Sequence, residues 1–310
     1  MTIRAIRFSF SLTALGTLSL PDYIGSTLRG GFGHAFKRVA CTFKGKPCDN
    51  CLLKHRCVYA YIFETLPPED SVMMRKYRRA PHPFIIEPPA VSPQKVEPGE
   101  PLEFNLVLIG RGIEYLPYFI YAFEELGKMG IGRGKGKYRL ERVTCGAETI
   151  YEGSSQVMKP VSSGDTPIFP PVDMAEDRIR INFSTPTRIV RDEKLVDAPT
   201  FQDIFRTLLR RISLLSYFHC GKELDVDYKG LIDKSGLIET TSSNLVWHDW
   251  ERWSSRQEER MLLGGFMGTI TCSGNLRDFL QFLVFGEHIH VGKGTGFGLG
   301  RYEIMKGGDA

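Results

Sequence analysis

A histidine near the start of the chain is surrounded by polar residues at helical spacing. Steps of three and four residues join Tyr23, Thr27, Gly30, His34 and Arg38, which a helix would place on one face, with Lys37 beside His34. An imidazole next to two cations suits general acid–base chemistry at a ribose 2′-hydroxyl, because the cations stabilise the negative charge that develops on the phosphorane. Tyr23 would lie about 16 Å from His34 along the axis, so the two could only flank a ligand. The alternative is a histidine that packs or binds phosphate.

Two glycine-rich stretches, at residues 130–136 and 294–300, could approach a phosphate chain closely. Neither has the spacing of a Walker loop or of a dinucleotide-binding turn. In the first stretch Arg133, Lys135 and Lys137 alternate with the glycines and precede Tyr138. Bases beside an aromatic ring are typical of single-stranded nucleic-acid contacts, and a plain flexible turn is the alternative.

A cysteine cluster occupies residues 41–57. Four of the seven cysteines of the chain fall within it, at Cys41, Cys48, Cys51 and Cys57. The pair Cys48 and Cys51 has zinc-knuckle spacing, and four thiolates also suit an iron–sulfur cluster. We expect a structural Zn²⁺, or alternatively a [4Fe-4S] cluster, that stabilises an insertion; buried thiols without a metal are the alternative reading.

The remaining histidines indicate less. His290 stands just before the second glycine-rich stretch and could contact RNA, ligate a metal or serve as an ordinary polar residue; RNA contact is the functional role that we favour. The tryptophans at 247, 250 and 253 are expected to pack in a core.

The elements that position these residues follow from hydrophobic periodicity. Alternation over residues 8–14 predicts a strand and not a signal peptide. A helix should follow from about residue 23, with strands at 58–63, 84–87, 102–109 and 137–143 and a helix at 115–128. Thr200 with Asp203 predicts the start of an apolar-faced helix that runs to about 218.

The two halves repeat the same order of elements. Gly130, Gly132, Gly134 and Gly136 before Lys137 and Tyr138 align with four glycines, a base and a tyrosine at 294–302. This repeat predicts an α+β chain of two tandem ferredoxin-like (RRM-like, βαββαβ) domains. The first domain covers residues 1–147, with the cysteine-rich metal-binding insertion at 41–57, a Gly-, Ser- and Pro-rich linker covers 148–176, and the second domain covers 177–310.

Charge is distributed unevenly along the chain. The formal net charge of +4 divides into +7 for residues 1–150 and −3 for the rest. No apolar run is long enough to span a membrane, and reduced cysteines fit a cytoplasmic protein. An anionic partner is therefore expected at the first half.

Taken together, these motifs resemble the CRISPR-associated pre-crRNA processing endoribonucleases of the RAMP superfamily. The similarity covers nearly the whole chain. It is carried by residues 28–35, the cysteine cluster, residues 84–89, 130–140 and 250–257, and above all by the final signature at 290–302.

The resemblance implies metal-independent cleavage of CRISPR repeat RNA by 2′-hydroxyl attack, which leaves a cyclic phosphate. It implies a catalytic His34, with Tyr23 and Lys37 as weaker matches, and no cofactor for catalysis. Together with the basic and glycine-rich segments it gives these expected RNA-binding residues: Arg29, Arg38, Arg133, Lys135, Lys137, His290, Lys293, Gly294, Gly296, Gly298, Gly300 and Arg301. The expected partners are repeat RNA or crRNA and other CRISPR effector subunits.

Two rival functions remain open at this stage. The first is a non-catalytic RNA-binding RAMP scaffold subunit of a CRISPR effector complex, which would bind repeat RNA without cleaving it. The second is a redox or metal-sensing protein built around the cysteines, which would show a visible chromophore. Cleavage of repeat RNA in EDTA separates the enzyme from the scaffold.

Overall fold

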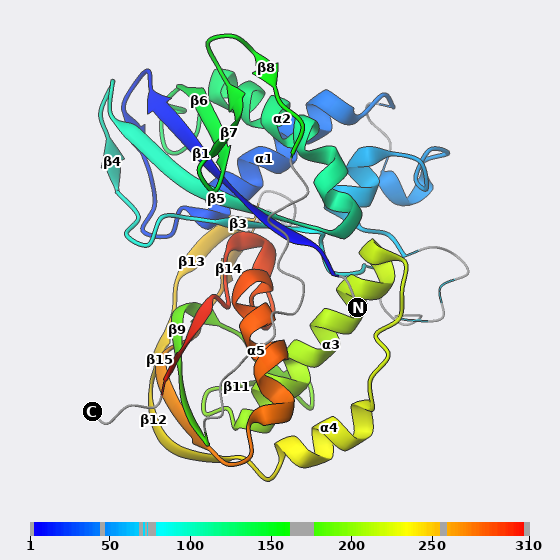
Figure 1. Ribbon diagram of the computed structural model, residues 1–310. Coiled ribbons are helices and arrows are strands. Elements are labelled where there is room, and N and C mark those ends of the chain that lie inside the picture. Colours follow the sequence, from blue (N-terminus) through cyan, green and yellow to red (C-terminus); the bar gives the residue numbers. More distant parts are fainter. Residues whose placement is uncertain are drawn as a thin grey trace. The chain divides into compact units, whose positions relative to one another are not determined.

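A computed structural model describes residues 3–43, 47–67, 71, 73, 79–161, 177–254 and 259–306. At 251–254 and 259–262 it describes the backbone only. The chain forms two compact units (Figure 1). The N-terminal unit comprises Arg4–Thr166 and Tyr217–Gly221, and the C-terminal unit comprises Met1–Ile3, Pro167–Ser216 and Lys222–Ala310. Both combine helices with antiparallel sheets, so the predicted α+β class with two units is confirmed. Among the described residues no helix is long and apolar enough to cross a membrane.

The N-terminal unit is built on a six-stranded sheet in the order β3-β5-β1-β6-β7-β8. Its strands are β1 (Ala5–Ala14), β3 (Phe84–Glu87), β5 (Pro101–Ile109), β6 (Tyr138–Cys145), β7 (Glu148–Glu152) and β8 (Val157–Met158). A small second sheet pairs β2 (Leu18–Ser19) with β4 (Lys95–Val96). The helix α1 (Gly25–Ala40) follows β2, and α2 (Leu116–Met129) lies between β5 and β6 in the chain.

The core of this unit explains why these elements form. Alternate residues of β1, such as Phe8 and Phe10, are completely buried, as a half-buried strand requires. On α1 the buried positions recur at helical spacing, and Phe32 stacks on Phe119 of α2 with ring centroids 4.8 Å apart. Gly31 faces Leu126 near the end of α2, whereas Phe36 faces Tyr118 near its start, so the two helices run antiparallel.

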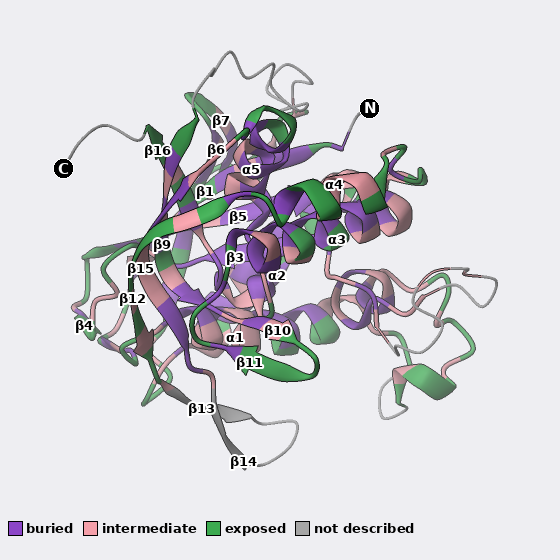
Figure 2. Ribbon diagram, turned by 90° about the horizontal axis from the view of Figure 1, so that it is seen from below, coloured by how far each residue is buried: buried purple, intermediate pink, exposed green. Residues whose placement is uncertain are grey.

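The C-terminal unit has a sheet with a corresponding strand order. Its sheet has the order β12-β15-β9-β16, with β9 (Arg178–Thr187), β12 (Glu239–His248), β15 (Gly265–Ser273) and β16 (Tyr302–Lys306). The helices are α3 (Phe201–Cys220), α4 (Tyr228–Ser235) and α5 (Arg277–Ile289), and two hairpins pair β10 (Ile189–Arg191) with β11 (Lys194–Val196) and β13 (Glu251–Ser254) with β14 (Glu259–Leu262). The edge strand β12 is exposed along most of its length (Figure 2).

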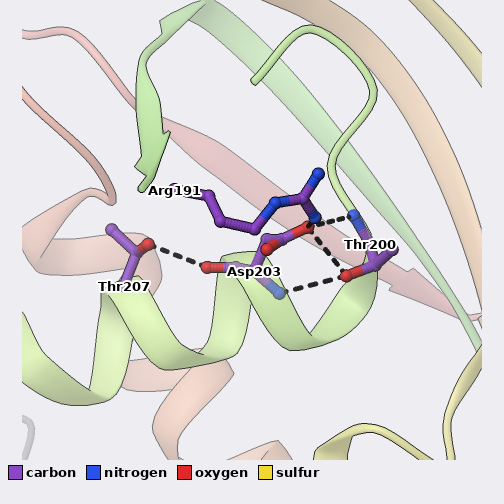
Figure 3. A network of polar contacts seen from close by, with 4 residues as sticks. All are labelled: Arg191, Thr200, Asp203 and Thr207. Atoms are coloured by element: carbon purple, nitrogen blue, oxygen red, sulfur yellow. Dashed lines mark hydrogen bonds and ion pairs between the residues drawn. The ribbon is translucent and has the colours of Figure 1, made fainter. Parts of the chain in front are cut away.

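The start of α3 confirms the predicted capping pair (Figure 3). Asp203 Oδ2 accepts hydrogen bonds from the backbone N–H of Thr200 at 3.0 Å and from its hydroxyl at 2.8 Å, while the Thr200 hydroxyl oxygen faces the Asp203 N–H at 3.3 Å. Arg191 adds a charged contact to the same carboxylate at 2.9 Å. This reciprocal arrangement gives partners to the N–H groups of Thr200 and Asp203 at the start of the helix.

Two expectations from the sequence are wrong in detail. The segment expected as a strand at 58–63 is helical and contains a π-turn, Ala60–Glu64, in which the Thr65 N–H donates to the Ala60 carbonyl. A short apolar run does not distinguish a strand from a buried helical turn. The expected linker at 148–176 begins too early, because its first residues form β7 and β8 beside β6; residues 162–176 lie outside the described part.

Candidate active site and nucleic-acid interface

His34 lies on the exposed face of α1, in the second half of the helix. His34, Lys37 and Arg38 are all exposed, whereas the neighbouring Phe32, Ala35 and Phe36 are buried in the core. The ring of His34 has no hydrogen-bond or ion-pair partner among the residues that the structure describes. An imidazole so placed is accessible to a ligand and lies next to two cations.

Gly30 stands one turn before His34 on the same face. A Cβ atom added at Gly30 would meet nothing within 4 Å, so packing does not require a glycine there. Gly33 is different, because its Cβ would lie 2.4 Å from Phe63 Cζ. The backbone beside His34 is therefore open to a ligand, although a helical glycine costs about 1 kcal/mol relative to alanine.

Tyr23 is not on this face, in contrast to the predicted stripe. It precedes α1, which begins at Gly25, and its half-buried phenol lies near the carboxylate of Glu87. Burial, and then this carboxylate, raise the pKa of Tyr23 well above its usual range. Glu87 is almost fully buried, and Arg7 holds it with Nε–Oε2 and Nη2–Oε1 distances of 3.0 Å. Tyr23 therefore stays protonated, and it cannot act as a base.

Lys37 is turned toward the cysteine-containing segment. Its ammonium lies 5.7 Å from the centre of the Tyr59 ring, a cation–π contact. Its positive charge also lowers the pKa of the Cys48 thiol and so opposes the increase that burial causes. Lys37 thus contributes positive potential near His34 while it contacts the Tyr59 ring.

Arg29, expected to bind RNA, makes its contacts with other residues of the N-terminal unit. Its guanidinium stacks over Phe63 at 4.7 Å and donates to His82 Nε2 at 2.8 Å. Because a guanidinium only donates, Nε2 is the acceptor and the proton of His82 is on Nδ1, which lies 2.7 Å from the Thr65 hydroxyl. Sequence reasoning missed His82, whose flanking prolines gave no sign of this contact.

The first glycine-rich stretch is a tight turn that exposes its bases. Arg133, Lys135 and Lys137 are exposed, while the backbone packs against residues 17–19: the Arg133 N–H donates to the Ser19 carbonyl at 2.8 Å, and a Cβ at Gly132 would lie 2.1 Å from that oxygen. Since α2 is antiparallel to α1, this turn lies toward the start of α1 and Arg38 lies toward its end. His34 is between the two groups of bases along the helix pair.

The second glycine-rich stretch is mostly buried. Gly296, Gly298 and Gly300 are buried and Gly294 is half-buried, so these glycines serve close packing. His290 is fully buried, and its Nδ1 lies 3.0 Å from the Leu299 carbonyl, to which it donates. Its ring faces protein and not solvent, in contrast to the expected RNA contact. Lys293 is exposed, and Arg301 is half-buried with Glu303 at 3.6 Å.

The cysteines of the insertion are half-buried and reduced. Burial raises the pKa of Cys48; Glu64 adds to the increase and, more weakly, so do Cys57 and Cys41, which are therefore near it. Cys51 lies next to them in sequence. However, within the described ranges no three His, Cys, Asp or Glu side chains are grouped so that they could hold a metal ion.

Two family models match the chain, one in each half. Residues 3–163 match the family model AF_1859_N, an N-terminal domain, and residues 181–302 match CRISPR-associated endoribonuclease Cas6. An uncharacterized protein of Archaeoglobus fulgidus is 25% identical over 307 residues, which are 96% of this chain and 99% of the relative.

Solved structures share the fold at low sequence identity. A Cas6 product complex has a TM-score of 0.58 and 16% identity, covering 97% of this chain and 100% of that chain. Thermus thermophilus Cas6 has a TM-score of 0.56 and 15% identity, with 98% and 100% covered. The first model matches just over half of the chain, which therefore belongs to the AF_1859_N family, and residues 181–302 of the C-terminal unit match CRISPR-associated endoribonuclease Cas6.

Proposed function

We propose that this protein matures CRISPR RNA by cutting repeat RNA without a metal ion. The observation that carries the proposal is the exposed His34 on α1, with Arg38 and Lys37 on one side and an open Gly30 on the other. The bases of the first glycine-rich turn, Arg133, Lys135 and Lys137, are exposed as well. The match of residues 181–302 to CRISPR-associated endoribonuclease Cas6 supports the substrate class.

His34 acts as the general base in this proposal. Its imidazole takes the proton of a ribose 2′-hydroxyl, and the 2′-oxygen attacks the adjacent phosphorus. The bond from phosphorus to the 5′-oxygen breaks, and that oxygen takes a proton from the imidazolium or from water. The products are a 2′,3′-cyclic phosphate and a 5′-hydroxyl end. Arg38 and Lys37 stabilise the additional negative charge on the phosphorane, and Tyr23 takes no part.

Cleavage of a labelled repeat RNA by the purified protein in EDTA tests the proposal. We expect cleavage that a single 2′-deoxy substitution at the scissile position blocks and that His34→Ala reduces by at least about a hundredfold. His248→Ala is a matched control, because His248 is also exposed but ends β12 in the other unit. Full activity of His34→Ala, or activity that depends on added metal, would contradict the mechanism.

A non-catalytic RNA-binding subunit is the second candidate. The exposed Arg133, Lys135 and Lys137 favour it, since phosphate contacts need no histidine. One structural neighbour is part of a Cas6-RT-Cas1–Cas2 complex, at TM-score 0.58 and 13% identity, covering 98% of this chain and 46% of that chain. This supports assembly with other CRISPR subunits. Tight binding of repeat RNA with no product would favour this candidate.

The fold details and the metal belong to the same proposal. The strand orders β3-β5-β1-β6 and β12-β15-β9-β16 support two ferredoxin-like units derived from one duplicated element. The spacing of Cys41, Cys48, Cys51 and Cys57 supports a structural Zn²⁺ or a [4Fe-4S] cluster, which no catalytic step uses. Metal analysis and an absorption spectrum of protein purified without oxygen decide between them. We place the protein in the cytoplasm, where thiols stay reduced and RNA is present.

A further inference from the structure

Arg211 is a buried cation in α3. Only 8% of its surface is exposed, its Nε donates to the Ile289 carbonyl at 2.9 Å, and its Nη2 has no acceptor among the described residues. Burial lowers the pKa of Arg211 to about 9, which still leaves it charged at neutral pH. Removing a charge from water without a carboxylate partner lowers stability, so this arrangement requires an explanation.

The partner of Arg211 is the end of a helix. Ile289 is the last residue of α5, and its carbonyl lies at the negative end of the helix dipole, where a cation is favoured. One turn earlier, a Cβ at Gly286 would lie 2.9 Å from the Leu208 side chain, so α5 and α3 are in close contact there (Figure 1). Arg211 is the next contact along this pair, and it fixes the point at which the chain leaves α5.

The chain that leaves α5 is the second glycine-rich loop. His290 has a φ of 60°, which side-chain-bearing residues rarely adopt, and the bond from its ring to the Leu299 carbonyl joins the two ends of the loop. The Val291 N–H donates to the Gly300 carbonyl at 2.9 Å, and the Lys293 N–H donates to the Arg188 carbonyl at 2.9 Å. The loop therefore follows α5 without a spacer, and hydrogen bonds of its first residues, His290 and Val291, join it to its own end.

We propose that Arg211 is a positioning residue that holds the loop 290–301 in the shape in which it presents Lys293 to RNA. Arg211 itself touches no RNA and acts through Ile289 and His290. The inference rests on the proposed function for its RNA measurements, but not for its effect on the loop. The buried charge of Arg211 then lowers the stability of the unit but keeps the loop 290–301 in one conformation.

Arg211→Met tests this proposal, since methionine fills similar space without the charge or the donor. We expect the unfolding midpoint to stay unchanged or rise, because an apolar residue of similar volume replaces a poorly compensated buried ion. Hydrogen exchange at the amides of Val291, Lys293 and Gly300 should become about tenfold faster, and repeat RNA should bind about tenfold more weakly. The slope of log affinity against log salt should stay the same, since no phosphate contact is lost.

Two control variants make the readouts specific. Arg206→Met removes an exposed arginine of the same helix and should change none of these quantities. Lys293→Ala should reduce the salt slope by about one unit without faster exchange in the loop.

Each contrary outcome overturns the inference. Unchanged amide exchange in Arg211→Met would show that the loop does not depend on Arg211. A smaller salt slope would show direct phosphate contact. If Arg211→Met does not fold, Arg211→Lys replaces it, and failure of both variants to fold would assign Arg211 to folding alone. If the wild-type protein binds no RNA, the proposed function fails, while the exchange measurement still decides the role of Arg211.

Discussion

The glycines of α1 offer a direct test of where RNA passes. Gly30 and Gly33 lie in the same helix three residues apart, so both gain the same helix propensity on substitution by alanine. Their surroundings differ: the Cβ of an alanine at 30 would meet nothing within 4 Å, whereas at 33 it would lie 2.4 Å from the ring of Phe63. A pair of single substitutions therefore separates propensity from packing.

The expected stabilities follow from these contacts. Gly30→Ala should stabilise the protein by about 0.5–1 kcal/mol, which corresponds to a rise in Tm of about 2–3 °C for a unit of this size. Gly33→Ala gains the same amount but forces Phe63 to move. Phe63 is stacked on Tyr59 at 5.5 Å and lies under the Arg29 guanidinium, so overpacking should cost about 1–3 kcal/mol. Gly33→Ala should therefore be less stable than Gly30→Ala by that amount.

Urea unfolding and repeat-RNA cleavage are the two assays. In Gly30→Ala the new methyl group occupies the space one turn from His34, so we expect kcat/KM to fall about tenfold while stability rises. A Gly30→Ala protein that is stabilised and cleaves at the wild-type rate would refute RNA passage over this face. Equal stability of the two variants would refute the packing of Phe63 against α1.

Three further predictions concern alkaline stability, helix capping and salt dependence. Burial raises the pKa of Tyr138 well above its usual value, so above pH about 10 only the unfolded state loses this proton, and this residue should lower stability by about 1.4 kcal/mol per pH unit. Tyr138→Phe should reduce the alkaline slope of the free energy of unfolding by that amount, with the remaining slope due to other buried tyrosines such as Tyr302. Asp203→Ala should lower the free energy of unfolding by about 1–2 kcal/mol, measured by thermal melting against exposed Arg206→Ala. Lys135→Ala should reduce the salt slope of RNA binding by about one unit, whereas Lys229→Ala should leave it unchanged.

Local signals in the sequence were sufficient for several elements. The alternation of Phe8, Phe10 and Leu12 predicts β1 because one face of a sheet is buried. Thr200 and Asp203 predict the start of α3 because capping depends only on residues in contact along the chain. The exposure of His34 also follows from helical spacing, since Phe32, Ala35 and Phe36 determine the buried face.

Side-chain direction at other positions depends on residues far away in the sequence. Arg29 points inward because the rings of Phe63 and Phe84 and the acceptor His82 gather around it. His290 is buried because Leu299, nine residues later, supplies the acceptor for its ring. The sequence next to Arg29 or His290 shows a basic residue near glycines and does not reveal these distant partners. From the sequence alone, both residues are therefore predicted to bind RNA.

The glycine-rich stretches of the two units share one contact and differ in their surroundings. In each unit a buried tyrosine after the glycine-rich stretch donates to a carbonyl of the preceding helix: Tyr138 to Phe123 at 2.8 Å and Tyr302 to Leu283 at 2.6 Å. A helical glycine makes room for each ring, since a Cβ at Gly127 or at Gly286 would meet the tyrosine within 3.0 Å. The residues between glycine and tyrosine are more numerous in the C-terminal unit, and the longer loop folds back into its own core there. In the N-terminal stretch the exposed Arg133 and Lys135 stand where the C-terminal stretch has the half-buried Phe297 and the buried Leu299, so residue type at matched positions accounts for the exposed bases of the first stretch.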